Sequence, residues 1–347
     1  MGINRETSAN NLSLKYKLLD LVTSSWKSQA IYVAAELKIA DYLLEAPKTT
    51  DELAEKTGTH ARALKRLLSG LSSIEVFRQV DDDLFEITPM GKLLCSDSNE
   101  SLRSWALWWG TNLWQTWGNL LYSVQTGESA RKLISGKDGF DHLKGNSEAA
   151  EIFNNALVEL TRLAAESIVN AYNFSEFDTV MDVGGGYGEL LITILDKNLN
   201  CKGILFDLPH AKVGAKKRFK QAGLKHRFEF EEGDFFDSVP PGADAYILKS
   251  VIHDWNDEDS RSILENCRKA IKPDSRLLLA EQILPDKFDV LSNHQSLARS
   301  DLTMLAALGA GERTEAEFKA LLKSSGFSVT KIVSAGPTFS VIEAEPA

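Results

Sequence analysis

This chain of 347 residues has few cysteines, few basic residues and no long apolar run, and each shortage excludes a class of protein. Its three cysteines, Cys95, Cys201 and Cys267, are spaced too widely for a zinc cluster or a disulfide framework. The 39 Lys and Arg are outnumbered by 49 Asp and Glu, which argues against a general affinity for nucleic acid or anionic membranes. No stretch approaches the roughly 18 apolar residues of a membrane span, and the polar N-terminus does not have the pattern of a signal peptide. We therefore expect a cytoplasmic protein of two domains.

The first half of the chain predicts a mainly α-helical domain, to which we assign residues 1–170. Within it, residues 49–52 fit a capping box that opens a helix, and Gly58 ends that helix. A second helix is expected over 61–71, followed by a hairpin with strands at 76–80 and 84–88. Helix, turn, helix and hairpin is the order of a winged helix.

A winged helix raises the possibility of DNA binding, and the charge of this segment argues against it. Residues 47–95 contain seven Lys or Arg and eight Asp or Glu. A solvated helix face explains the basic cluster of Arg62, Lys65 and Arg66 better than phosphate contacts do. We expect a structural or dimer-forming module, and a ligand-sensing transcription factor stays open as a non-enzymatic alternative.

The second half, residues 171–347, predicts a different architecture. Short apolar runs alternate with helical text, a pattern typical of a parallel sheet covered by helices on both faces. The expected fold class is therefore α/β and doubly wound, preceded by the mainly α domain. A long helix at 149–172 leads into the first of the predicted strands, which cover 179–183, 203–207, 226–231, 244–250 and 276–281.

A glycine-rich turn, Asp182-Val-Gly-Gly-Gly-Tyr-Gly188, lies between the first strand and its helix, where such folds bind ligands. We expect Gly184 and Gly186 to contact the ligand, because glycine permits both a sharp turn and a close approach to the backbone. A P-loop is excluded, since no Gly-Lys-Ser/Thr follows, and the carboxylate of Glu189 in the first helical turn disfavours phosphate.

Acidic residues at the next two strand ends favour a nucleoside-like ligand. Asp207 follows the second strand and is suited to accept hydrogen bonds from both ribose hydroxyls. Asp234 and Phe235 follow the third and offer an acceptor for an adenine amino group and an aromatic surface. S-adenosyl-L-methionine fits, because it carries no phosphate and its positive charges suit an acidic cleft. The competing interpretations are helix capping for Asp182 and Asp207 and a turn for Asp234.

Six motifs occur in order along the chain: Asp182 to Gly188, Phe206 to His210, Gly233 to Phe236, Ile252 to Glu258, Ala280 to Pro285 and Glu312 to Phe318. Together they resemble one enzyme family, the S-adenosylmethionine-dependent O-methyltransferases of the caffeic acid and acetylserotonin type, which include plant phenolic and bacterial natural-product tailoring enzymes. The likeness covers nearly the whole chain.

The resemblance implies a Rossmann-like methyltransferase domain preceded by a winged-helix dimerisation domain, and a homodimer. It implies that His253 is the general base and that Glu281 and Glu312 flank it. It also implies an aromatic small-molecule substrate and S-adenosyl-L-homocysteine as product. We expect no metal for a separate reason: the other histidines, His60, His142, His210, His226 and His294, have no ligand-like spacing with one another. The residues that it places on the cofactor are Gly184, Asp207, Leu208, Asp234, Phe235 and Lys249.

Methyl transfer to oxygen requires a positioned nucleophile and removal of its proton. Histidine suits the removal of the proton, because its unperturbed pKa of ~6.5 lets it be neutral yet basic near pH 7. A carboxylate on its other ring nitrogen would fix the tautomer and stabilise the imidazolium. For Asp254, cofactor binding and helix capping stay equally open. C- or N-methylation, or a non-methylating use of the cofactor, remains an alternative function.

Two features bear on the substrate. Five of the seven tryptophans lie between positions 105 and 117, and we expect at least one of them to line a pocket. Leu157 stands where many members of the family have methionine, which predicts a reshaped pocket. The sequence does not identify the acceptor.

Overall fold

The computed structural model describes residues 3–137, 139–143 and 145–347, and this part of the chain divides into two compact units, residues 1–112 and 113–347. The sequence placed a boundary near residue 170 instead. Residues 113–170 pack with the second unit, because the apolar face of the long helix α11 (Ser147–Ala171) is buried against α12 (Glu189–Lys197), β10 (Phe327–Ala335) and β11 (Phe339–Pro346). The assignment of residues 1–170 to a dimerisation domain and of residues 171–347 to a catalytic domain stays a prediction.

The first unit contains the expected winged helix. Thr49 and Glu52 form a capping box at the start of α4, and Gly58 ends that helix in a left-handed conformation. Helix α5 follows, and β2 and β3 form the antiparallel hairpin, with β1 paired to β3. The elements of this unit are α1 (Ile3–Thr23), α2 (Ser25–Glu36), α3 (Ile39–Leu43), β1 (Lys48–Thr49), α4 (Thr50–Thr57), α5 (Ala61–Ser72), β2 (Phe77–Asp81), β3 (Leu84–Ile87), α6 (Pro89–Lys92) and α7 (Arg103–Trp108).

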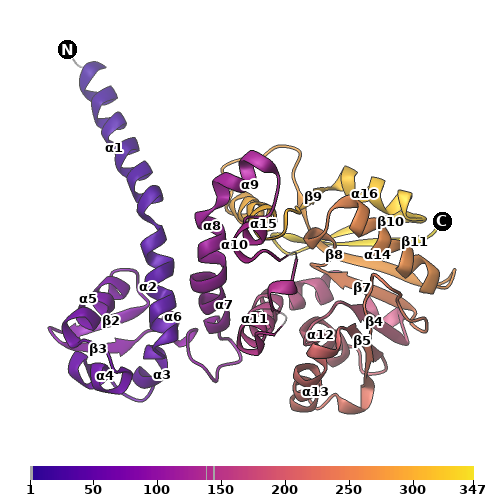
Figure 1. Ribbon diagram of the computed structural model, residues 1–347, viewed down its shortest axis with the longest axis horizontal. Coiled ribbons are helices and arrows are strands. Elements are labelled where there is room, and N and C mark those ends of the chain that lie inside the picture. Colours follow the sequence, from indigo (N-terminus) through magenta and orange to yellow (C-terminus); the bar gives the residue numbers. More distant parts are fainter. Residues whose placement is uncertain (1–2, 138, 144) are drawn as a thin grey trace. The chain divides into compact units, whose positions relative to one another are not determined.

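The second unit is built on an eight-stranded sheet (Figure 1). Its strand order is β10-β11-β8-β7-β4-β5-β6, and the short β9 pairs with β8. The pairs that β4, β5, β6, β7 and β8 form with one another are all parallel, as expected. The strands are β4 (Thr179–Val183), β5 (Lys202–Asp207), β6 (Phe228–Glu232), β7 (Ala245–Lys249), β8 (Arg276–Leu284), β9 (Arg313–Thr314), β10 (Phe327–Ala335) and β11 (Phe339–Pro346).

The C-terminal hairpin β10–β11 makes the sheet mixed, because β11 pairs antiparallel with β8. The sequence analysis did not predict these two strands. Strand β10 has a largely exposed and half-exposed pattern with a bulge near Val329, so its alternation of apolar and polar residues is interrupted. An edge strand of this kind gives a weaker sequence signal than the buried β4 and β7.

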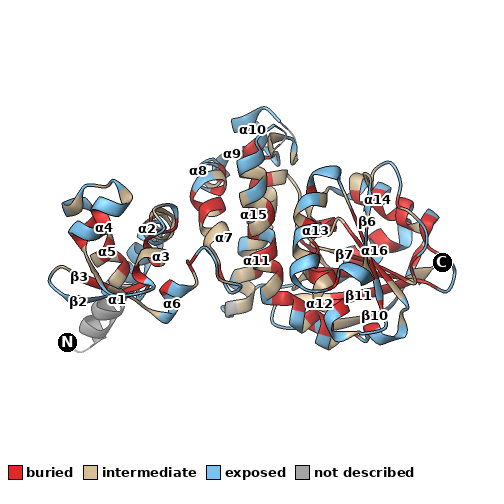
Figure 2. Ribbon diagram, turned by 90° about the horizontal axis from the view of Figure 1, so that it is seen from below, coloured by how far each residue is buried: buried red, intermediate tan, exposed pale blue. Residues whose placement is uncertain are grey.

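Helices cover both faces of the sheet, and alternate residues of each central strand point to opposite cores. In β7, Ala245 and Ile247 join the core with α11, α12 and α13, whereas Tyr246 and Leu248 join the core with α14 and α16. Figure 2 shows red, buried residues concentrated in the centre of this sheet, where β4 and β7 are buried almost throughout, whereas β6 and β10 are largely exposed or half-exposed. The longer helices of the unit are α12 (Glu189–Lys197), α13 (Lys212–Gln221), α14 (Asp257–Ala270), α15 (Ser292–Leu308) and α16 (Glu315–Ser324), and the shorter ones are α8 (Trp114–Gly118), α9 (Leu120–Thr126) and α10 (Ala130–Ser135).

Candidate active site

The predicted site residues lie at one edge of the sheet, where strands β4 to β8 end. Parallel strands that run in one direction bring their carboxyl ends together, so segments far apart in sequence become neighbours. We divide this edge into two parts. The glycine-turn side comprises residues 184–188, 207–208 and 234–235, and the histidine side comprises residues 249–257, 281, 300 and 312–313.

Glycine is required at the start of α12 on the glycine-turn side. Gly188 is the N-cap of α12 and has a φ of 79°, a conformation that L side chains rarely adopt. A Cβ built on it would lie 2.5 Å from Cε2 of Phe219. At Gly184, with a φ of 71°, a Cβ would lie 3.3 Å from Cε1 of Phe235. The backbone of the turn therefore packs directly against aromatic rings.

Asp207 ties the glycine turn to the end of β5. Its Oδ2 accepts the N–H of Gly186 at 2.7 Å, and its Oδ1 accepts the N–H of Leu208 at 2.7 Å. Burial raises the pKa of this carboxyl, and the two backbone hydrogen bonds oppose that rise. Each oxygen keeps a further lone pair, so the group is able to accept hydrogen bonds from a diol as well.

The other two acids on this side are placed differently. Asp182 is only 2% exposed and lies beneath the turn, where a Cβ on Gly185 would come within 2.5 Å of its carboxyl group. Burial, followed by the charge of Asp207, raises the pKa of Asp182 to about 7. Asp234 uses Oδ1 to accept the N–H of Phe236 at 2.9 Å, so one of its oxygens caps a turn.

Glu189 does not present a free carboxylate to the turn. Its two oxygens pair with Arg162 of α11, at 2.7 Å, and with Arg218 of α13. The charge is therefore compensated, and the sequence argument that Glu189 repels phosphate loses its physical basis. The absence of a Gly-Lys-Ser/Thr sequence still excludes a P-loop.

His253 lies on the histidine side, in the short helical turn Ile252–Asp254 that follows β7. Its Nδ1 is 2.9 Å from Oε1 of Glu312 and 3.8 Å from Oε2 of Glu281. Its Nε2 is 3.5 Å from Oδ1 of Asp254. The imidazole is thus surrounded by three carboxyl groups, and its side chain remains 10% exposed.

These carboxyl groups control the protonation of the imidazole. Burial disfavours the imidazolium, but Glu312, Asp254 and Glu281 together outweigh it and raise the pKa of His253 to about 10. Burial raises the pKa of Glu281 to about 7 and that of Asp254 to about 6. The pKa of Glu312 is lowered in spite of burial, because His253 and the hydroxyl of Ser300 favour its charged form. The cluster therefore favours an imidazolium paired with the carboxylate of Glu312.

Glu281 also fixes the backbone that bears His253. Ser250, at the end of β7, has a left-handed backbone with a φ of 53° and turns the chain. The next two N–H groups, of Val251 and Ile252, donate to Oε1 of Glu281 at 3.0 and 2.9 Å. A fully buried carboxylate on β8 thus holds both the imidazole and the turn from which it projects.

Lys249, the last residue of β7, connects the two sides of the edge with α11. Its Nζ donates to Oγ1 of Thr161 at 3.2 Å. Burial lowers the pKa of the ammonium group, and the nearby Glu281 and Asp182 oppose that shift. Leu157 lies one turn before Thr161 on α11 and is 38% exposed.

Aromatic rings gather beside His253. Trp255 meets Phe236 edge to face at 4.6 Å between ring centroids, Phe235 at 6.1 Å and Phe140 at 6.3 Å. Phe140 in turn contacts Phe153 of α11 at 5.6 Å. The expectation that a tryptophan of the 105–117 cluster lines a pocket stays a prediction; Trp108 of that cluster is buried, at 2% exposed.

One atom each from His253, Glu281 and Glu312 lies within 4.8 Å of the others, close enough for a metal ion to bridge them. Oε1 of Glu312 accepts from His253 and Ser300, and Oε1 of Glu281 accepts two backbone N–H groups, whereas Oε2 of each glutamate is buried without a hydrogen-bond partner among the described residues. This bonding fits acid–base chemistry, and the expectation of no metal stays a prediction.

The sequence analysis missed three side chains that support the site. Ser300 of α15 donates to Glu312 at 2.6 Å, Thr161 of α11 accepts from Lys249, and Arg313 binds the backbone around His253. Arg313 lies inside a motif that the sequence analysis quoted, but nothing in the local pattern shows what it binds. Ser300 and Thr161 lie in helices whose own periodicity carries no sign of the contact.

A parallel sheet with a glycine turn after its first strand and an acid after its second defines a Rossmann-like, nucleoside-binding class of enzyme. Family models narrow this class. An O-methyltransferase dimerisation domain matches residues 19–97 and an O-methyltransferase domain matches residues 117–328. The chain belongs to the O-methyltransferase family, and it is an S-adenosylmethionine-dependent enzyme of the natural-product and phenolic type.

Individual relatives cover nearly the whole chain. The phenazine O-methyltransferase PhzM of Lysobacter antibioticus is 41% identical over 97% of this chain and 98% of its own. An 8-amino-8-demethylriboflavin N,N-dimethyltransferase of Streptomyces davaonensis is 32% identical over 90% of each chain. Among solved structures, human N-acetylserotonin methyltransferase in complex with S-adenosylmethionine has a TM-score of 0.87 at 26% identity, over 96% of this chain and 98% of that one. The cofactor is therefore S-adenosylmethionine, as this and other related complexes indicate.

The residues present fit that cofactor. The glycine turn leaves its backbone bare of side chains, Asp207 has lone pairs for a diol, and Phe235 offers a ring beside Gly184. No cation occupies the P-loop lysine position, since Tyr187, Gly188 and Glu189 follow the glycines.

Among the described residues, none of the helices combines the length and hydrophobicity that a bilayer-spanning segment requires.

Proposed function

We propose that His253 is the general base that removes the proton from the acceptor hydroxyl of an aromatic small molecule. The observation that supports this most is the 2.9 Å contact between Nδ1 of His253 and Glu312. A proton on Nδ1 that is donated to this carboxylate leaves the lone pair of Nε2 for the acceptor. S-adenosylmethionine supplies a methyl group activated by the sulfonium. Nε2 of His253 receives the hydroxyl proton as the new oxygen–carbon bond forms and the carbon–sulfur bond breaks, which leaves S-adenosylhomocysteine and a methyl ether.

The three carboxyl groups around His253 have a role in this scheme. They stabilise the imidazolium that results from proton transfer, which lowers the energy of the state in which the acceptor is an oxyanion. They also keep the ligand-free imidazole protonated near neutral pH, since they raise its pKa to about 10. A cationic ligand in the same cleft would lower that pKa. We therefore expect activity to rise with pH through and above neutrality.

We assign cofactor binding to Gly184, Gly186, Asp207, Leu208, Asp234 and Phe235 on the glycine-turn side, and to Lys249 at the start of the histidine side. Asp207 holds the ribose hydroxyls, because it already anchors the turn and retains acceptor capacity. Phe235 and Leu208 supply apolar surface for the adenine ring of the cofactor. Lys249 contributes a half-buried cation near Asp182 and Glu281, which limits the negative charge at this edge.

A polycyclic or phenolic acceptor fits the histidine side. The rings of Trp255, Phe140 and Phe153 form a continuous aromatic group beside His253. Such flat apolar side chains suit an aromatic ligand. The relative named for phenazine O-methylation, at 41% identity, supports the same class of acceptor.

N-methylation is a second candidate, because the relative at 32% identity is named an N,N-dimethyltransferase. A neutral amine has its own lone pair and does not need a base before it attacks. Retention of the histidine with both glutamates on this chain therefore favours an oxygen acceptor, whose proton must be removed.

The experiment incubates the purified protein with methyl-labelled S-adenosylmethionine and matched pairs of aromatic phenols and amines. We expect labelled ethers, and we expect His253→Ala to abolish most of their formation while S-adenosylhomocysteine still binds by calorimetry. Labelled amines with no ether from any phenol would favour the second candidate. Equal ether formation by wild type and His253→Ala would contradict the base assignment.

We further propose that the protein is a cytoplasmic homodimer that does not bind nucleic acid. The dimerisation domain matches residues 19–97, and α1 exposes an apolar row at Leu14, Leu18 and Leu21, which are 64%, 62% and 65% exposed. A monomer by light scattering, or salt-dependent DNA binding in a gel shift, would contradict this part of the proposal.

A further inference from the structure

We propose that Arg313 is a positioning residue for His253: its guanidinium holds the backbone on both sides of the histidine and so sets where the imidazole stands. This inference rests on the base role proposed above for His253. Arg313 is the first residue of β9 and immediately follows Glu312, the carboxylate that binds the imidazole.

The contacts of Arg313 bracket the catalytic turn. Its Nη1 donates to the carbonyl of Ile252 at 2.9 Å, and its Nη2 donates to the carbonyl of Trp255 at 2.8 Å. These are the residues just before His253 and just after Asp254. The planar fork of a guanidinium supplies several donors in fixed directions, so one side chain defines the separation of the two carbonyls.

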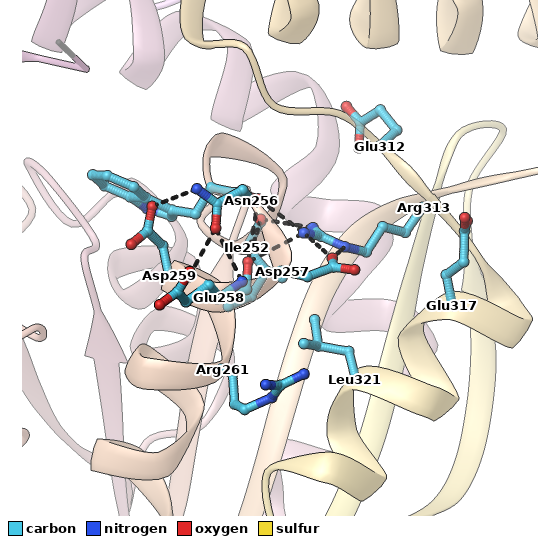
Figure 3. Close-up of polar contacts among 12 residues, drawn as sticks. Ile252, Asn256, Asp257, Glu258, Asp259, Arg261, Glu312, Arg313, Glu317 and Leu321 are labelled. Atoms are coloured by element: carbon cyan, nitrogen blue, oxygen red, sulfur yellow. Dashed lines mark hydrogen bonds and ion pairs between the residues drawn. The ribbon is translucent and has the colours of Figure 1, made fainter. Parts of the chain in front are cut away.

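The same guanidinium is also held in place by side chains of α14. Nε and Nη2 donate to Oδ1 of Asp257 at 3.0 and 2.8 Å, and Nη2 also contacts Oγ of Ser260 at 3.2 Å. Figure 3 shows Arg313 directed toward Ile252 and Asp257, with Glu312 on the loop that precedes β9. The arginine side chain is 8% exposed, whereas that of Asp257 is 77% exposed. The fork is therefore buried against the turn and anchored at the start of α14.

Three charged side chains, one from β8 and two from the β9 segment, thus bind different parts of the turn that bears His253. Glu281 accepts the N–H groups of residues 251 and 252, Arg313 binds the carbonyls of residues 252 and 255, and Glu312 binds the imidazole. Since residues 312 and 313 are adjacent, a shift of β9 would move the imidazole partner and the backbone clamp together. An ordinary structural ion pair at the protein surface would have no such link to the base.

The test compares three variants: Arg313→Gln, which removes the charge; Arg313→Lys, which keeps the charge without the fork; and Arg268→Gln as a matched control. Arg268 also donates to backbone carbonyls, those of Gly326 and Ala347, but its partners lie away from the site. We expect kcat to fall about 10 to 10² fold in Arg313→Gln, because small displacements of a reacting group have effects of that order. Arg313→Lys should recover little of the loss, and Arg268→Gln should retain the wild-type kcat.

Two further readouts separate positioning from a loss of folding. The affinity for S-adenosylhomocysteine, measured by calorimetry, should be unchanged in Arg313→Gln and Arg313→Lys. In a His253→Ala background, Arg313→Gln should add little to the loss, since the residue acts through the histidine. If Arg313→Gln does not fold, Arg313→Lys provides the same comparisons.

The inference is overturned if kcat falls no more in the Arg313 variants than in Arg268→Gln, if cofactor affinity falls in parallel with kcat, or if the loss is as large in the His253→Ala background. Failure of the base assignment has a different signature, namely an active His253→Ala protein. In that case the pKa of His253, measured by nuclear magnetic resonance titration of the imidazole, still tests whether Arg313 positions the histidine. A loosened turn weakens the contact with Glu312, so the pKa should be lower than in wild type in Arg313→Lys, which keeps the positive charge near Glu312, and an unchanged pKa would contradict the inference.

Discussion

The two sides of the sheet edge are built by different means. The glycine-turn side is held by hydrogen bonds between backbone N–H groups and Asp207, and by glycines that allow rings to pack against the main chain. The histidine side is held by buried charged groups from the turn after β7, from β8 and from the β9 segment, together with one hydroxyl group from α15. The first side is suited to binding a ligand in a fixed place, and the second is suited to moving a proton. Changes on the two sides should therefore affect different measured quantities.

The largest effect is expected for His253→Ala. Loss of the general base should lower kcat by about 10² to 10⁴ fold, with the affinity for S-adenosylhomocysteine unchanged. Steady-state kinetics with labelled cofactor and calorimetry measure the two quantities. If cofactor affinity falls together with kcat, the two sides are not functionally separate.

Asp207→Ala should produce the converse pattern. It removes an acceptor of two backbone N–H groups and the proposed partner of the ribose hydroxyls, so the dissociation constant for S-adenosylhomocysteine should rise by roughly 10² fold. At saturating cofactor, kcat should change much less, and the pH dependence of kcat should stay the same. A control is Asp237→Ala, a neighbouring acid for which the structure gives no link to the glycine turn; it should bind the cofactor as wild type does.

Glu312→Gln tests the electrostatics of the histidine side. Its charge favours the imidazolium and so raises the pKa of His253, which means that its removal must lower that pKa. The rise of kcat/KM with pH should move to lower pH, while the maximal rate falls about 10 to 10² fold because the imidazolium loses its partner. A profile that stays in place, or moves to higher pH, would show that Glu312 does not set the protonation of the base.

The smallest effect is expected for Gly188→Ala, which tests the packing of the glycine turn. The added Cβ would meet Phe219 at 2.5 Å, and the variant should lose about 1 to 3 kcal/mol of unfolding free energy in urea. Gly223→Ala is the matched control, because its φ of 73° is similar but nothing lies within 4 Å of the new atom. Equal losses in the two variants would show that backbone strain alone, and not the approach of Phe219, requires glycine at position 188.

The glycine-turn side was the more predictable of the two. The sequence Asp182 to Gly188, followed by Asp207 at the next strand end, is a local pattern, and its position at the sheet edge follows from strand alternation. The capping box at Thr49 and Glu52 and the hairpin after it were predictable for the same reason, since each depends on residues close in sequence. Strand β10 was not predicted, because a bulged edge strand lacks regular alternation.

On the histidine side, the sequence and its family resemblance pointed to His253, Glu281 and Glu312, but they did not predict the protonation states of these side chains. A neutral imidazole was expected near pH 7, whereas three converging carboxyl groups favour the charged form. Glu189 was expected to repel phosphate, whereas two arginines from α11 and α13 neutralise it. In both cases the error concerned a charge, and the partners that corrected it are distant in sequence.

The amino-acid sequence by itself determined the winged helix, the alternation of parallel strands and helices, the glycine loop and the family to which the chain belongs. All of these depend on short-range patterns of residue type. Only the tertiary structure decided that Arg313 clamps the turn of His253, that Ser300 binds Glu312, and that residues 113–170 pack with the catalytic unit. The reason is physical: side-chain pairing and protonation depend on distances between atoms, and these distances exist only once the strands and helices have packed.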